Sequence, residues 1–406
     1  MKKILILLLT IISVNNNLKA NSLSDNISLS GFIRSDVIYD SRESARVREN
    51  AIMLFPLPDK ADPNGDDLNA KEDLTMFVLH TRLRSTITGP DAFGAKTTGI
   101  IEGEFFGTDD GDANGFRVRH AFINMDWGKT QLLFGQFWNP LFITDCLPNY
   151  NFSSPFIPYG RKPQLRITRK YNNFYMSATA SMQSDFKSKG PGNETNPVIS
   201  STEFSKNSGT PDLNFLVGYK KESTAFGLGF DGKSIVPRTV YEGVKTDQSL
   251  TSLSAIAWLR FDIKPITFKY QAIFGQNLTD HVMLGGYAVR KDDPEQFSNI
   301  NMFSTWGELS WGKDVKLSFY GGYSRNLGTN QDIILDKNQI YAMGADIQSL
   351  YRIAPSVIVK SGPMRIIAET EYTAAVYGNS KNERLEMENL KTFENFRINL
   401  AAYYHF

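Results

Sequence analysis

A run of positive charge lies between Arg161 and Lys170. These ten residues are rich in Arg and Lys, contain no Asp or Glu, and follow a segment, 139–160, that holds four prolines. A guanidinium group presents a fixed fork of donors that suits carboxylate or phosphate. If the proline-rich segment folds into a water-filled lumen, Arg166 can face the narrowing that it makes. The residue types therefore predict a site that holds anions.

Other charged residues occupy alternate positions in neighbouring segments. Arg82 and Arg84 lie in 74–88, and Glu102 and Glu104 lie in 95–106. Facing charges of opposite sign would orient polar solutes. The alternative is that these charges only pair with one another and solvate the interior. The pattern at His120 and Phe122 leaves the facing of Arg117 and Arg119 open. The predicted constriction and solute-binding residues are Arg161, Arg166, Arg119, Arg117, Arg82, Arg84, Glu102 and Glu104.

The elements that carry these charges alternate apolar and polar residues, the pattern of a barrel with lipid outside and water inside. Long loops and short turns follow each other, and 41–73 is expected to be a polar loop. The sequence predicts an all-β fold, a transmembrane antiparallel β-barrel of about 16 strands, with 139–160 as an inward-folding constriction loop. The predicted strands are 27–40, 74–88, 95–106, 116–127, 131–138, 161–170, 174–185, 213–221, 225–236, 250–261, 266–276, 301–311, 315–325, 340–359, 364–377 and 393–406.

The beginning of the chain predicts export. Met1-Lys2-Lys3 precedes a short apolar run, and Ala20 is a small residue suited to cleavage, so 1–20 is expected to be a signal peptide and 21–406 the barrel domain. No segment approaches the roughly 20 apolar residues of a transmembrane helix. A single cysteine excludes a disulfide framework within the chain, and a net charge of +1 gives no support for nucleic-acid binding. The expected location is the outer membrane of a Gram-negative bacterium.

The last predicted strand alternates up to a terminal phenylalanine. Phe396, Ile398 and Leu400 would point outward, with Arg397 between them. A barrel strand ending at Phe406 resembles the signal that the outer-membrane barrel assembly machinery recognises. The alternative is a strand of a secreted β-sandwich, which would leave several edges to protect, whereas closure removes them.

Several segments resemble the DcaP-like trimeric porins, in the form found in Bacteroidetes-type bacteria. They are Ser30–Asp36, Tyr39–Arg42, Arg117–Phe122, Gly135–Trp138 and Arg161–Arg166. The resemblance implies a homotrimer of barrels that passes small anions such as dicarboxylates. It also implies that Arg161 and Arg166, with Arg119, contact the solute carboxylates. Family members often carry an amino-terminal coiled coil, whereas the first predicted strand here begins a few residues after Ala20.

Two other site chemistries are weighed on the residues. Asp110, Asp112 and Asn114 copy the first half of a calcium loop, but the completing acid falls at Ala121. With 62–67 they are candidates for a divalent cation that bridges lipopolysaccharide; solvated turns are the alternative. Catalysis has little support, because the four histidines fall in separate segments and no nucleophile or zinc motif appears.

Three functions remain in competition. The first is an anion-preferring porin for passive uptake of small solutes, without enzymatic activity or cofactor, with phosphate or polyphosphate as the rival to dicarboxylates. The second is a surface adhesin or scaffold barrel acting through its loops, 41–73, 186–210 and 278–298. The third is an outer-membrane hydrolase dependent on His80. Channel conductance would separate the first from the second, and the third predicts loss of activity on His80→Ala.

Overall fold

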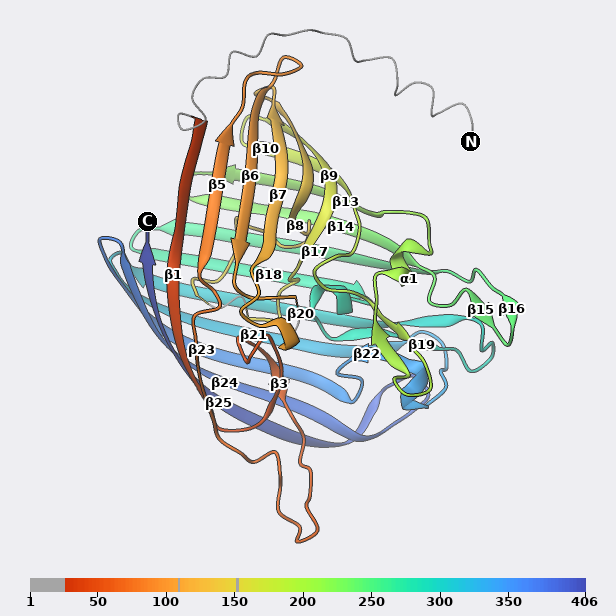
Figure 1. Cartoon of the computed structure of the whole chain (residues 1–406). Helices are drawn as coiled ribbons and strands as arrows, with labels where there is room; N and C mark the ends of the chain where they lie inside the picture. Colours follow the sequence, from red (N-terminus) through yellow and green to blue (C-terminus); the bar gives the residue numbers. More distant parts are fainter. Residues whose placement is uncertain (1–25, 109, 151–152) are drawn as a thin grey trace, which may run out of the picture.

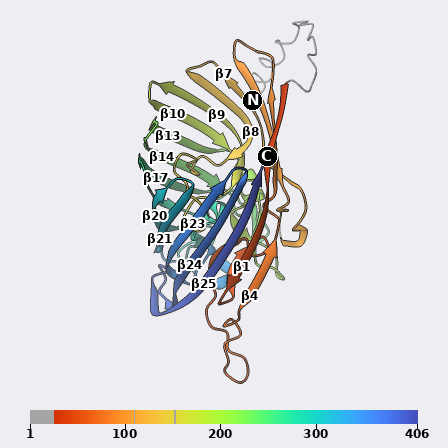
Figure 2. The same cartoon turned by 90° about the vertical axis from the view of Figure 1, so that its left-hand side faces the viewer.

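The chain forms one closed antiparallel barrel. The computed structural model describes residues 26–108, 110–150 and 153–406, so the expected signal peptide lies outside the described residues. A 19-stranded sheet closes on itself where β1 (Ile27–Asp40) pairs with β25 (Met387–His405). The two strands lie side by side in Figures 1 and 2. β4 and β5 pair with successive parts of β1 and count as one wall strand, and β19 and β22 are not part of the wall. The barrel therefore has 16 strands, as the sequence predicted.

The barrel strands run in sequence order around the wall. After β1 come β4 (Asp73–Phe77) with β5 (Arg82–Thr88), β6 (Lys96–Glu104), β7 (Arg117–Asp126), β8 (Thr130–Trp138), β9 (Arg161–Tyr171), β10 (Phe174–Ser181) and β13 (Asp212–Lys221). The remaining wall strands are β14 (Thr224–Ile235), β17 (Leu250–Ile263), β18 (Ile266–Gln276), β20 (Phe297–Gly312), β21 (Val315–Thr329), β23 (Ile347–Ser361), β24 (Met364–Lys381) and β25.

Smaller elements lie in the connections between wall strands. No helix in the described part of the chain is long and apolar enough to cross a membrane. The small elements are β2 (Ser44–Val47), β3 (Ile52–Pro56), β11 (Lys189–Pro191), β12 (Val198–Ser200), α1 (Glu203–Lys206), β15 (Val240–Tyr241), β16 (Val244–Lys245), β19 (Gly285–Val289), β22 (Ile340–Met343) and 3₁₀ turns at Asp110–Asp112, Thr279–His281 and Lys337–Gln339.

The two faces of the wall meet different surroundings. In β25, Phe396, Ile398 and Leu400 are exposed on the outer face, whereas Arg397 between them is buried in the lumen. The same alternation gives an apolar outer surface on the other strands, with exposed Leu83, Ile101, Phe134, Leu165, Phe215, Phe230 and Phe319. Closure satisfies the backbone, and an apolar exterior matches lipid, so this is an outer-membrane barrel.

Three segments fold inward from the loop end and fill much of the lumen. The loop 139–160 buries Leu141, Phe142 and Phe156 against wall residues such as Trp258. The hairpin of β2 and β3 buries Met53 and Leu54, and 277–289 is buried almost throughout. The first of these was predicted. The second corrects the prediction that 41–73 is a plain polar loop.

Two predicted strands are broken in the structure. The segment 74–88 is interrupted between β4 and β5, where Leu79 turns into the interior instead of continuing the wall. The segment 340–359 is interrupted between β22 and β23, because Gly344 adopts a positive φ of 65°. β22 then pairs with β19 rather than with the wall. The predicted strand 174–185 ends at Ser181, which frees Asp185 to turn toward β9.

Candidate functional site

Acidic and basic side chains of β5, β6 and β7 meet on the lumen face. In the β5–β6 pair, Arg82 lies opposite Glu104 and Arg84 lies opposite Glu102. The two glutamates are buried, and Arg119 Nε lies 2.8 Å from Glu102 Oε1 while its Nη1 lies 2.5 Å from Glu104 Oε2. Arg82 reaches both carboxylates at 3.6 and 3.4 Å. The glutamates therefore hold the guanidinium groups in fixed positions.

A β-bulge explains the broken alternation at His120. The register between β6 and β7 shifts, so that Glu102 pairs with His120 and Gly103 with Val118. The extra residue is Arg119, and a bulge of this kind re-aims side chains. Arg119 and His120 are consequently both buried in the lumen, whereas Val118 is exposed outside.

Asp185 joins this group from the loop after β10. Its carboxylate lies 2.8 Å from Arg161 Nη1, 2.7 Å from Arg117 Nη1 and 3.8 Å from Arg48 Nη2. Burial raises the pKa of Asp185, but the charges of Arg161, Arg117 and Arg48 outweigh it and hold this pKa below its usual value. Six guanidinium groups share three carboxylates, a formal excess of three positive charges; the six are Arg48, Arg82, Arg84, Arg117, Arg119 and Arg161.

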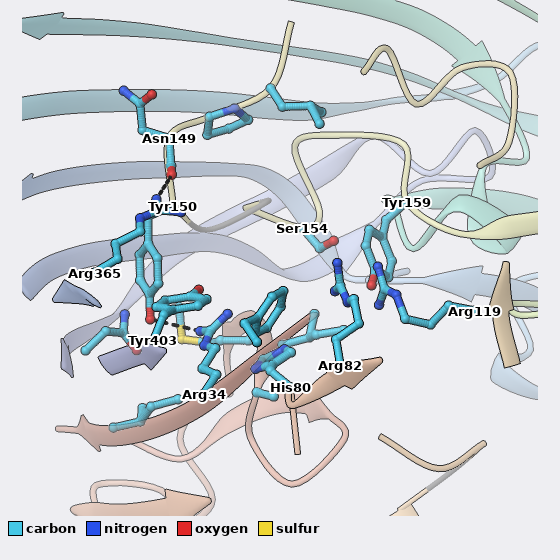
Figure 3. A pocket seen from close by; sticks show the side chains of 18 of the residues that line it. Arg34, His80, Arg82, Arg119, Asn149, Tyr150, Ser154, Tyr159, Arg365 and Tyr403 are labelled. Atoms are coloured by element: carbon cyan, nitrogen blue, oxygen red, sulfur yellow. Dashed lines mark hydrogen bonds between the residues drawn. The ribbon is translucent and has the colours of Figure 1, made fainter. Parts of the chain in front are cut away.

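A cavity of about 240 Å³ lies beside this group, inside the barrel. Figure 3 shows Arg365 and Arg34 on one side of it, together with Tyr150 of the inward loop, and Arg82 and Arg119 on the other side. None of the described residues that line it is Asp or Glu. We name this space the cationic cavity. Its other polar lining residues are His80, Asn149, Ser154, Tyr159, Asn399, Tyr403 and His405.

Aromatic rings and the inward loop position Arg34 and Arg365, which lie on one side of the cationic cavity. Arg34 lies 5.2 Å from the ring centre of Tyr150 and 4.9 Å from that of Tyr403, and its Nη2 pairs with Asp36 at 2.5 Å. Arg365 Nη2 donates to the Asn149 carbonyl at 2.5 Å. Arg365 forms no ion pair with any carboxylate in the described part of the chain. Its charge is therefore the least compensated in the cavity.

The structure separates the two arginines of the opening run. Arg161 is 1% exposed, lies 4.2 Å from the ring centre of Trp138, and is absent from the described lining of the cationic cavity. Arg166 Nη2 donates to the Trp138 carbonyl at 3.0 Å. It lines a different cavity of about 400 Å³, which the first residues of the inward loop also line, together with Lys170 and Lys220.

The predicted site residues thus fall into three groups. Arg82 and Arg119 line the cationic cavity. Arg84, Arg117, Arg161, Glu102 and Glu104 pair around them, and Arg166 lies apart. Their role toward a solute stays a prediction.

Sequence reasoning left Arg34, Tyr150 and Tyr403 out of the predicted site. Strict alternation from Asp36 does place Arg34 on the lumen face, so that signal was present in the strand. No local pattern brings Tyr150 to Tyr403, because 139–160 reaches them by folding across the lumen.

The calcium candidates receive no support from the described residues. No group of three or more His, Cys, Asp or Glu among residues 26–108, 110–150 and 153–406 is placed to hold a metal ion. Asp112 instead accepts hydrogen bonds from the Thr108 backbone at 2.6 Å and hydroxyl at 3.0 Å. Asn114 has a φ of 83° in the turn that follows. A loop-bound cation stays a prediction.

Comparison with known proteins shows the fold. No family model and no curated protein matches the chain in sequence. The outer membrane channel DcaP of Acinetobacter baumannii is similar in structure, with a TM-score of 0.69 at 16% identity, over 94% of this chain and 97% of that one. An anion-selective porin from Comamonas acidovorans has a TM-score of 0.56 at 10% identity, over 94% and 99%. The trimer form of OmpT, an outer membrane protein of Vibrio cholerae, has a TM-score of 0.51 at 13% identity, over 94% of this chain and 99% of that one.

The class follows from these observations. A closed barrel of 16 strands, an apolar exterior and a charged lumen narrowed by an inward loop define a porin-type outer-membrane barrel. At these identities the likeness to DcaP, and to the porin from Comamonas acidovorans, is one of fold.

Proposed function

We propose that the chain is an outer-membrane porin whose lumen passes small anions, such as dicarboxylates, by diffusion and without enzymatic action. The observation that carries this proposal is the cationic cavity, where Arg34, Arg82, Arg119 and Arg365 converge and no described lining residue is Asp or Glu. Rings of charged side chains at a constriction select ions of opposite sign. The excess of guanidinium groups behind the cavity acts in the same direction.

The arrangement suits a solute with two separated charges. Arginines approach the cationic cavity from opposite sides, so a molecule carrying a carboxylate at each end can meet a guanidinium at both ends (Figure 3). A volume of about 240 Å³ admits a small solute only. Phosphate carries its charge on one centre, so we expect it to bind here less tightly than a dicarboxylate.

The proposal includes assembly as a homotrimer. Its support is the shared fold with barrels that include a trimer form, and an apolar outer wall that can contact lipid or a second copy. Chemical cross-linking of the protein in native membranes tests it, and a monomer-only pattern would contradict it.

Ion selectivity in planar bilayers tests the channel proposal. We expect wild-type protein in a KCl gradient to give a reversal potential shifted from zero toward the equilibrium potential of chloride. Arg365→Gln should move that potential toward zero, because it removes an uncompensated charge from the cavity lining. The matched control is Arg325→Gln, which removes an exposed arginine from the outer face of β21 and should leave the potential unchanged.

A panel of blockers separates the solute classes. Succinate should reduce chloride current at lower concentration than acetate, and phosphate should lie between them. A silent barrel would contradict the channel and favour the adhesin interpretation. A cation-selective channel would contradict the anion proposal.

A further inference from the structure

One wall arginine holds two inward segments at once. Arg352 of β23 is 1% exposed, and its Nη1 donates to the Ser154 carbonyl at 3.2 Å, while its Nη2 donates to the Met53 carbonyl at 3.3 Å. Ser154 belongs to the loop 139–160, and Met53 belongs to the hairpin of β2 and β3. These segments are far apart in the sequence, and this one side chain donates a hydrogen bond to each of them. The guanidinium fork suits such a double contact.

Arg352 is itself fixed by neighbours on β24. Its Nε donates to Thr373 Oγ1 at 2.8 Å and lies 3.2 Å from Glu371 Oε1. Its guanidinium carbon lies 5.2 Å from the ring centre of Phe156. Glu371 and Thr373 are also buried, so the charge of Arg352 is paired and its rotamer is set by the wall.

Both carbonyl acceptors belong to residues that line the cationic cavity. Met53 and Ser154 are part of its described lining, whereas Arg352 is not. Arg352 therefore lies behind the two segments that form this part of the lining. A change at Arg352 can alter the cavity's width without removing a charge that faces the solute.

The hairpin needs such anchors. Arg48, Glu49 and Asn50 adopt positive φ values of 60°, 53° and 69°, a left-handed conformation that non-glycine residues rarely keep unless their surroundings enforce it. A two-stranded hairpin is also only marginally stable alone. A further anchor acts on the hairpin only, because Tyr377 donates its hydroxyl to the Pro56 carbonyl at 2.9 Å.

We propose that Arg352 is a positioning residue that sets the width of the cationic cavity by holding the hairpin and the inward loop together. The proposal rests on the porin function proposed above, because width matters only if solutes pass. When both hydrogen bonds are lost, the two segments separate from the wall, the cavity widens, and ions pass with less contact with its arginines.

Thiol accessibility tests the positioning role without any need for conduction. The native cysteine is replaced (Cys146→Ala), and one probe is placed on the hairpin by Ala51→Cys or on the loop by Ser154→Cys; both sites line the cavity. A charged methanethiosulfonate reagent then reports exposure. Arg352→Gln with Glu371→Gln avoids leaving a buried carboxylate unpaired. We expect modification at both probes to accelerate about tenfold, the order that one lost hydrogen bond to a charged group produces.

The matched variant is Tyr377→Phe, which removes the anchor of the hairpin alone. It should accelerate modification at position 51 but not at position 154. Bilayer recordings of the Arg352→Gln, Glu371→Gln protein should show a larger single-channel conductance and a weaker anion preference, whereas Arg325→Gln should show neither.

The outcomes separate the two proposals. If wild-type protein does not conduct, the porin proposal fails, and the two probes still decide whether Arg352 holds the segments. If wild-type protein conducts and the double variant matches it in labelling and conductance, the positioning role is wrong. Acceleration at only one probe would also overturn it, because a single segment would then depend on Arg352.

Discussion

Two arginines five positions apart in one strand have different physical roles. In β9, Gln164, Arg166 and Thr168 alternate with the exposed Leu165 and Ile167, so alternation correctly places Arg166 on the lumen face. Arg161 begins the strand, where it is buried beside Trp138 and forms an ion pair with Asp185. No sequence pattern indicates that partner, because Asp185 reaches Arg161 only when β10 ends at Ser181.

Substitution should separate these roles. Arg161→Gln leaves Asp185 with weaker pairing, and breaking a buried ion pair costs about 3–5 kcal/mol, less here because Arg117 also contacts Asp185. We expect a clearly lower unfolding midpoint in urea. Arg166→Gln breaks no ion pair with a described carboxylate, so its midpoint should stay near wild type. The more drastic Arg166→Glu should move the reversal potential toward cations. Equal midpoints for both Gln variants would contradict the assignment.

At the scale of elements, alternation predicted the wall better than the lumen. The bounds of β1, β9 and β18 were predicted within one residue, because lipid and water impose the period of two along the whole strand. The hairpin of β2 and β3 was missed, since its inward position involves contacts with residues about 300 positions away, such as Arg352 and Tyr377. Inward folding is a tertiary property, and local patterns do not carry it.

The inward segment 277–289 should open in acid. Burial lowers the pKa of His281 to about 3. The charges of Lys162 and Lys233 also lower this pKa, whereas the charge of Asp280 raises it. A released loop binds this proton near pH 6.5, and the docked loop does not. Docking is therefore fully stable above pH 6.5 and weakens as the pH falls from there toward 3. Between pH 6.5 and 3, His281 alone lowers the free energy that favours docking by about 1.4 kcal/mol per pH unit.

A cysteine probe at the buried position 283 measures this opening in the Cys146→Ala background. The same probe is also labelled in a His281→Asn protein. The ratio of the two labelling rates cancels the pH dependence of the thiol itself. This ratio should rise up to about tenfold per unit below pH 6.5. A ratio independent of pH between 7 and 5 would show that His281 does not limit opening.

At the scale of the whole molecule, the average charge conceals the local one. The chain has a net charge of +1, yet six arginines share three carboxylates beside the cationic cavity. Composition therefore excludes a strongly charged protein but says little about the lumen. What composition and periodicity do predict is the class, since an apolar exterior and a polar lumen are properties of every strand.

Closure of the barrel depends on the seam where β1 meets β25 and Phe406. Gly31 N donates to the Phe406 carbonyl at 3.0 Å, and Phe406 N donates back to the Gly31 carbonyl at 3.2 Å. A Cβ at Gly31 would lie 2.2 Å from the Arg82 carbonyl oxygen, a backbone atom that cannot yield without parting β1 from β5. A side chain at Gly31 would therefore separate β1 from β5 directly beside the seam.

Gly31→Val should therefore prevent closure. Folded barrels commonly migrate faster in unheated than in heated detergent gels, and we expect this shift in wild type but not in Gly31→Val. Gly307→Ala is the control, because a Cβ there would meet its nearest atom at 3.6 Å, an ordinary contact. A Gly31→Val protein with the wild-type shift would mean that β1 can be displaced at the seam without loss of the barrel. Since an open sheet edge in lipid leaves backbone groups unsatisfied at several kcal/mol each, that outcome would place the closing contact elsewhere.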